Sequence, residues 1–198
     1  MNKHLRQVGL AVGLLGIVAI STAALKPDFG FTPESRVWVE GTSSVRSYTC
    51  QAAEVKGTVE STVPAFDVTR LEGAVARAEV VIDAAALDCG NGTMNGHMRK
   101  ALKVSEHGTI SFRLSDYRAI PAGAETQLKL NGTLEIAGTA QPITVDAMAA
   151  AAGGGAIRVK GTHTIKMTDY GVRPPSLMLG TMKVHDPVKL NFDVVLKP

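Results

Sequence analysis

The stretch Val188-Lys-Leu-Asn-Phe-Asp-Val-Val-Leu196, near the end of the chain, alternates apolar and polar side chains. Successive side chains of a β-strand point to opposite faces, so this strand has one dry face and one wet face. Few helix signals separate it from earlier stretches of the same kind, and closing an antiparallel sheet into a barrel buries such strands economically. The pattern predicts an all-β barrel, whose interior is the natural place for a ligand. The earlier stretches have their apolar positions at Ile110, Phe112, Leu114; Leu128, Leu130, Leu134, Ile136; and Ile157, Val159, Ile165.

Length and composition fit one domain of this kind. The chain has 198 residues, of which 45% are hydrophobic, and this suffices for a real core. Only 5% are aromatic and 20 are glycine, which is typical of a β protein with many turns and a cavity lined by slender side chains. A net charge of +3, without a cluster of Lys and Arg interleaved with aromatics, excludes a nucleic-acid surface.

The N-terminus has the pattern of an export signal. Lys3 and Arg6 precede an apolar run over 8–20, and small residues follow at 21–24. The alternative is an uncleaved anchor, because 8–25 is just long enough to cross a bilayer. We expect a signal peptide over 1–24, a linker over 25–35 and the barrel over 36–198. The folded part is then periplasmic, and it meets a membrane only transiently or through an uncleaved N-terminal segment.

Two cysteines, Cys50 and Cys89, remain in the exported part. An even count in an oxidising compartment favours a disulfide. The alternative is a metal site that adds His97 and one more ligand. The sequence contains no CxxC, HxH or HExxH spacing, so we predict no metal site.

One helix is predicted, over 91–104. Met94, Met98, Ala101 and Leu102 fall on one face at helical spacing, and basic residues take the other face. This helix is interpreted as a lid on the end of the barrel. The loop over 169–184 is unusually apolar, and we expect it to dip into the barrel mouth.

Strand parity predicts which side chains face the interior. His163 points inward, either as a core residue bonded to the barrel or as a partner for the polar end of a ligand. Ala147 and Ala149 share the parity of Val145, so they either open a channel or leave a gap that Phe112 or Phe192 fills. The expected ligand contacts are Phe112, Leu114, Leu128, Leu130, Val145, Ala147, Ala149, Val159, His163, Ile165, Met178, Phe192 and Val194.

Catalytic patterns are missing from the sequence. It has no GxSxG and no glycine-rich phosphate loop, and acids such as Asp116 and Asp193 stand isolated. We therefore predict no catalytic residues and no enzyme activity. No cofactor is expected.

A succession of motifs over Arg36–Lys197 resembles the YceI-like family of exported bacterial lipid-binding proteins. Where such proteins often have Tyr-Pro before the strand at Thr109, this chain has His107-Gly108. The matching motifs, in order, are Trp38-Val-Glu-Gly-Thr-Ser-Ser44-Val45, Val80-Val-Ile-Asp-Ala, the helix with Met94 and Met98, Thr109-Ile-Ser-Phe112, Leu134-Glu-Ile-Ala-Gly138-Thr, Asp169-Tyr-Gly171-Val and Val184-His-Asp-Pro-Val188.

The resemblance implies an extended eight-stranded antiparallel barrel, lipocalin-like in shape, with a small capping helix. Its tunnel would hold a polyisoprenoid or another long-chain amphiphile, and no enzyme activity is implied. We expect an exported protein that sequesters or carries such a lipid. The alternative is an envelope stress or interaction module with a filled barrel and no ligand. A homodimer is left open.

Overall fold

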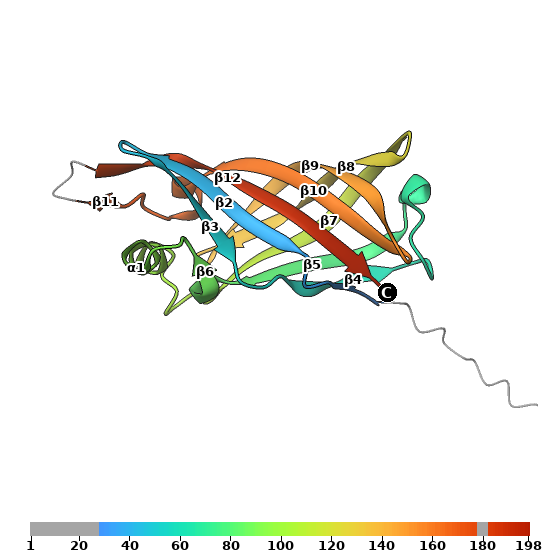
Figure 1. Cartoon of the computed structure of the whole chain (residues 1–198), viewed down its shortest axis with the longest axis horizontal. Coiled ribbons are helices and arrows are strands. Elements are labelled where there is room, and N and C mark those ends of the chain that lie inside the picture. The colour runs from blue at the N-terminus through green and yellow to red at the C-terminus, as the bar shows by residue number, and fades with distance from the viewer. Residues whose placement is uncertain (1–27, 178–181) are drawn as a thin grey trace, which may run out of the picture.

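The computed structural model of the chain describes residues 28–177 and 182–198 (Figure 1). The predicted signal peptide and Met178 therefore lie outside the described residues.

Five long strands form one side of a barrel. Each pairs antiparallel with the next in chain order, and Figure 1 shows them tilted across the barrel axis. Four of them contain the alternating stretches from which the barrel was predicted. The strands are β7 (Thr109–Ala122), β8 (Glu125–Ile136), β9 (Thr139–Gly153), β10 (Ala156–Lys166) and β12 (Met182–Lys197).

The other side consists of three interrupted strands, each made of two consecutive segments. The first and second segments both pair with the same edge of β12. The third segment then pairs with the second and the fourth with the first. The fifth pairs with the fourth and the sixth with the third. Segment β5 also pairs with β7, so the ring is closed. The segments are β1 (Asp28–Phe31) with β2 (Arg36–Ser43), β3 (Ser47–Ala52) with β4 (Lys56–Ser61), and β5 (Val75–Asp83) with β6 (Leu87–Asp88).

Counted in this way the barrel has eight antiparallel strands, as predicted. Strand β1 corrects the predicted domain bounds, because residues 28–31 of the expected linker belong to the wall and Phe29 is completely buried. Four residues between two prolines are too short for alternation to be recognised in the sequence. The partners of β1 are β4 and the far end of the chain.

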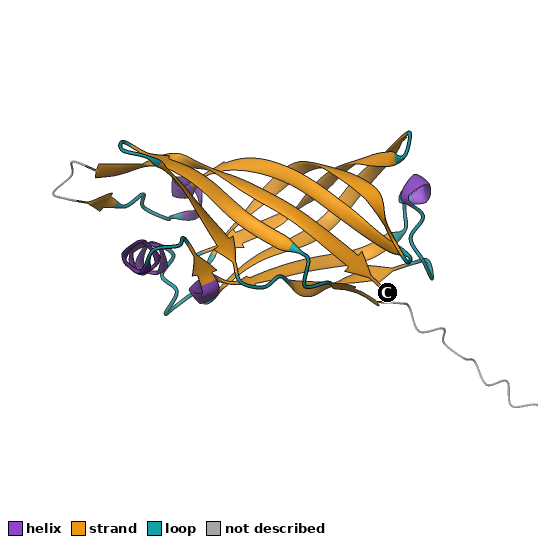
Figure 2. Ribbon diagram, in the orientation of Figure 1, coloured by secondary structure: helices purple, strands orange, loops and turns teal. Residues whose placement is uncertain are grey.

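Helical segments gather at the ends of the barrel (Figure 2). The helix α1 (Gly92–Ala101) is shorter than predicted, and the Asn91 side chain caps it by accepting a hydrogen bond from the Met94 backbone at 3.0 Å. The predicted loop before β12 contains a short strand, β11. The short elements are η1 (Val68–Arg70), η2 (Ala84–Ala86), η3 (Met167–Tyr170) and β11 (Ser176–Leu177).

A bulge in β7 reverses the parity of that strand. Leu114 pairs with Gly132 and Asp116 pairs with Asn131, so Ser115 is the extra residue. Before the bulge Phe112 and Leu114 share the inward face. After it Tyr117 and Ala119 face inward, whereas an unbroken alternation would have placed Asp116 there.

The predicted disulfide between Cys50 and Cys89 is present. Cys50 lies on β3 and Cys89 lies between β6 and α1, so the bond fastens the start of the helix to the barrel wall. The Cys89 backbone also donates a hydrogen bond of 2.8 Å to the Asn95 side chain within α1.

We expect Cys50→Ala/Cys89→Ala to lower the free energy of unfolding by about 4 kcal/mol, because the bond closes a long loop in the unfolded chain. Urea unfolding of the wild type with and without reductant measures this effect. The urea unfolding midpoint of the double variant should be the same with and without reductant. Equal midpoints for oxidised and reduced wild type would show that the bond does not constrain the unfolded chain.

Candidate ligand-binding tunnel

The barrel encloses a cavity of about 780 Å³, within the range of about 300–1,000 Å³ that is usual for ligand sites. Apolar side chains dominate its lining. The barrel is therefore not filled by its own side chains. This argues against the alternative of an envelope stress or interaction module with a filled barrel. The expected contact residues that line this cavity are Phe112, Leu114, Leu128, Leu130, Val145, Val159, His163, Phe192 and Val194.

Ala147, Ala149 and Ile165 are buried but do not line the cavity. Ala149 pairs with Thr126 on β8, and the Thr126 hydroxyl donates a hydrogen bond to the Val68 carbonyl of η1. The loop between β4 and β5 thus occupies the space beside the alanines. Ile165 packs in a separate cluster with Tyr170.

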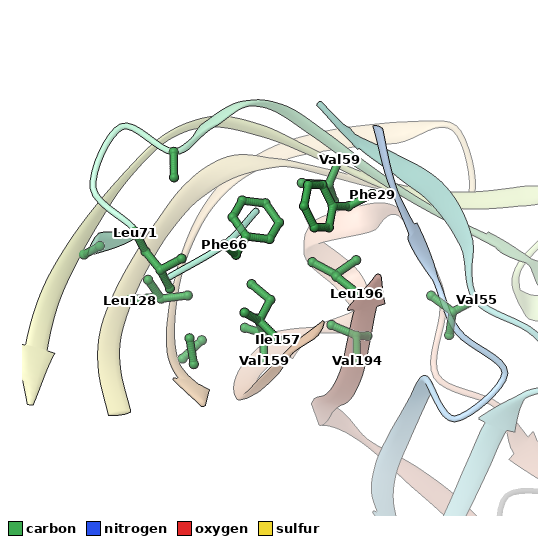
Figure 3. Close-up of a cluster of buried hydrophobic side chains, with 14 of the residues drawn as sticks. Phe29, Val55, Val59, Phe66, Leu71, Leu128, Ile157, Val159, Val194 and Leu196 are labelled. Atoms are coloured by element: carbon green, nitrogen blue, oxygen red, sulfur yellow. The ribbon is translucent and has the colours of Figure 1, made fainter. Parts of the chain in front are cut away.

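One end of the cavity is blind. The segment Thr62–Ala74, called the plug below, packs against β7, β8 and β9 through η1. Its Phe66 contacts Phe29 of β1, with ring centroids 4.0 Å apart. Figure 3 shows these rings with Leu71, Leu128 and Leu196 in one cluster.

Tyr117 anchors the plug to the wall. Its hydroxyl donates a hydrogen bond of 2.6 Å to the Leu71 carbonyl and accepts one of 2.9 Å from the Val75 backbone. Burial raises the pKa of the Tyr117 phenol, so the proton that it donates is retained at neutral pH. Two residues along β7, the Ala119 backbone donates to the Glu72 carboxylate at 2.5 Å. Sequence reasoning missed this anchor because the bulge that turns Tyr117 inward leaves no clear pattern.

The other end of the cavity lies under α1. Met94, His97, Met98 and Leu102 from this helix line it, as expected of a lid, yet no residue of α1 is fully buried. Arg46 and Asn91 add polar groups at this end. A chain inside the tunnel therefore meets apolar groups at the blind end and polar groups near α1.

Three aromatic rings lie against glycines of neighbouring strands. A Cβ atom on Gly161 would overlap the ring of Phe192, its cross-strand partner. Phe112 lies on Gly132 in the same way, and Tyr48 lies on Gly41. All three aromatics line the cavity, and the missing glycine side chains let the rings lie close to the wall and leave the bore open.

His163 lines the cavity and is half-buried. No residue in the described part of the chain forms a hydrogen bond with its ring. These residues therefore do not support the interpretation of His163 as a core residue bonded to the barrel. The ring nitrogens can form hydrogen bonds with a ligand.

No group of three or more His, Cys, Asp or Glu gathers as a metal site within residues 28–177 and 182–198. Over the same ranges, no helix is long and apolar enough to span a membrane.

The comparisons with known proteins agree with this geometry. The YceI-like domain model matches residues 34–196. No curated protein matches the chain.

Solved structures with the same fold come from several bacteria. Burkholderia cenocepacia BcnA is 22% identical, with a TM-score of 0.65 over 81% of this chain and 95% of its own. A polyisoprenoid-binding domain from Saccharophagus degradans, implicated in plant cell wall breakdown, is 14% identical, with a TM-score of 0.66 over 85% and 97%. A Campylobacter jejuni YCEI protein is 18% identical, with a TM-score of 0.58 over 100% and 99%. At these identities the likeness concerns the fold.

We expect Gly161→Ala to weaken binding of a slender lipid probe, because the new methyl group displaces the Phe192 ring into the bore. Overpacking should also lower the free energy of unfolding by about 1–3 kcal/mol. Adding Phe192→Leu should restore binding in part, because the methyl group also comes within 2.9 Å of the Asp146 carbonyl oxygen. A fluorescent lipid titration and thermal unfolding measure the two effects.

Gly30→Ala is the matched control, because a Cβ there has open space and the backbone needs no special conformation. Unchanged binding in Gly161→Ala, together with a lowered melting temperature, would show that the ring does not limit the bore.

Proposed function

Because this chain belongs to the YceI-like family, we propose that it is an exported binding protein that holds a polyisoprenoid or similar long-chain lipid in its barrel tunnel. The observation that carries the proposal is the apolar cavity, blind at the plug and bordered by polar groups near α1. The shape fits a molecule with one long apolar chain and one polar end. The protein would sequester the lipid or carry it between membranes, which it would meet only transiently.

Apolar burial supplies the affinity in this proposal. At about 25 cal/mol per Å² of apolar surface removed from water, a long chain gains several kcal/mol beyond the cost of ordering it. The tunnel wall is held in place by the closed barrel, so little of this gain is spent on ordering the protein. Among the described residues, the lining provides no Asp, Glu, Lys or Arg side chain deep inside, which favours chains over polar ligands.

The Cys50–Cys89 disulfide and the signal-like N-terminal sequence support export. Disulfides persist in oxidising compartments such as the bacterial periplasm. We place the protein there on these two grounds.

Val145→Phe tests the tunnel as the binding site. Val145 is buried and lines the cavity, so a larger ring there should exclude the lipid. Native mass spectrometry before and after organic extraction should find lipid on the purified wild type and much less on the variant. The matched control is Asp146→Phe, because Asp146 is exposed on the outer face of the same strand. Equal lipid on Val145→Phe and wild type, with both folded, would place the ligand elsewhere.

His163→Phe tests whether the imidazole binds the polar end of the ligand. The ring volume is kept and one hydrogen bond is lost, so affinity for a long prenol should fall about fivefold, or about 1 kcal/mol. Affinity for the corresponding hydrocarbon, which lacks the hydroxyl, should not change. Equal losses for both ligands would mean that His163 only shapes the tunnel.

A further inference from the structure

We infer that the plug sets the longest lipid chain that the tunnel accepts, and that Leu71 is the residue against which the chain ends. This inference rests on the proposed function, since it concerns the chain length of the same ligand.

Leu71 is the residue of the plug that lines the cavity. It is 3% exposed, and the wall side chains Leu128 and Leu196 belong to the same cluster. Phe66 and Phe29 are members of that cluster but do not line the cavity. The terminal carbons of a chain that enters from the α1 end therefore meet Leu71 before any other part of the plug.

A length limit requires a stop that does not yield, and the plug is fastened on both sides of Leu71. The Leu71 carbonyl accepts from Tyr117, and the next residue, Glu72, accepts from the Ala119 backbone. On the N-terminal side, the Val68 carbonyl accepts from Thr126, whose side chain is completely buried. Moving Leu71 outward would break these hydrogen bonds between part-buried groups, and a polar group left unpaired away from water is costly.

The plug is also closed on itself at its base. The Thr62 backbone donates to the Ala74 carbonyl at 2.9 Å, and the Thr62 hydroxyl donates to the Gly73 carbonyl at 2.8 Å. The Ser61 hydroxyl, fully buried, donates to the Ala74 carbonyl at 3.1 Å. These bonds hold the two ends of the segment together at the rim of the barrel, so the segment spans the opening as one unit.

Chain-length selection follows from a rigid blind end. Each further carbon of a chain increases the apolar surface buried until the terminus reaches Leu71. A longer chain must fold back within the tunnel or leave carbons in water near α1. Affinity should therefore rise along a series of lipids and then stop rising at one length.

The experiment measures affinities for a series of linear prenols of increasing length, from farnesol to undecaprenol, by displacement of a fluorescent lipid. The wild type should prefer one length. Leu71→Ala should move the preferred length to the next longer prenol, and Leu71→Phe should move it to a shorter one. Leu71→Val removes less of the side chain, and it replaces Leu71→Ala if that variant does not fold.

Ile165→Ala is the matched control, since Ile165 is buried outside the cavity lining and its truncation should lower stability without changing the preferred length. The inference is overturned if folded Leu71 variants bind prenols with the wild-type length preference. A wild type that binds no prenol of any length contradicts the proposed function instead. Tyr117→Phe, which frees the Leu71 carbonyl, should broaden the preference.

Discussion

The fold depends on the backbone pairing between the two ends of the described chain. Gly30 and Phe31 of β1 pair with Lys197 and Leu196 of β12, and the Ser35 hydroxyl accepts a hydrogen bond from the Val195 backbone where β1 passes into β2. Strand β2 continues this seam along the same edge of β12, and without β1 and β2 that edge would stay unpaired and the apolar face of the sheet would be open to water. Closure converts that face into an interior surface. The tunnel therefore depends on pairing between residues near the two ends of the described chain.

The sequence predicts the long strands well because their alternation is unbroken. A very short segment is harder to recognise, since the four residues of β1 are too few for a period of two to stand out, and these residues lie within the expected linker. Parity is reliable only up to the first bulge. At Ser115 in β7 one extra residue reverses the inward face, so Tyr117, the anchor of the plug, escaped notice although its neighbours Phe112 and Leu114 were predicted to face inward.

Parity also identifies inward side chains without identifying what they face. Ala147 and Ala149 were expected to leave room, and they do, but part of the protein itself takes that room. The plug carries no periodic pattern, and its polar contacts with the wall include single hydrogen bonds to the Leu71 and Val68 carbonyls. Such contacts arise from the geometry of the closed barrel, so the residue types within 62–74 do not predict them. The cavity could be predicted from the sequence, whereas its blind end could not.

The two ends of the tunnel are held by different kinds of interaction, and this difference determines how a ligand enters. Opening the plug would break part-buried hydrogen bonds from Tyr117 and Thr126 and would separate Phe66 from Phe29. Moving α1 breaks contacts of half-buried side chains and the exposed hydrogen bond of 3.0 Å from Arg99 to the Ala85 carbonyl, while the disulfide keeps its first turn in place. Because a polar group left unpaired away from water is costly and half-buried apolar contacts are weak, we expect the α1 end to open at a lower free energy than the plug. Under the proposed function, an amphiphile that enters there would go in tail first, and its polar end would come to rest beside the polar groups under the helix.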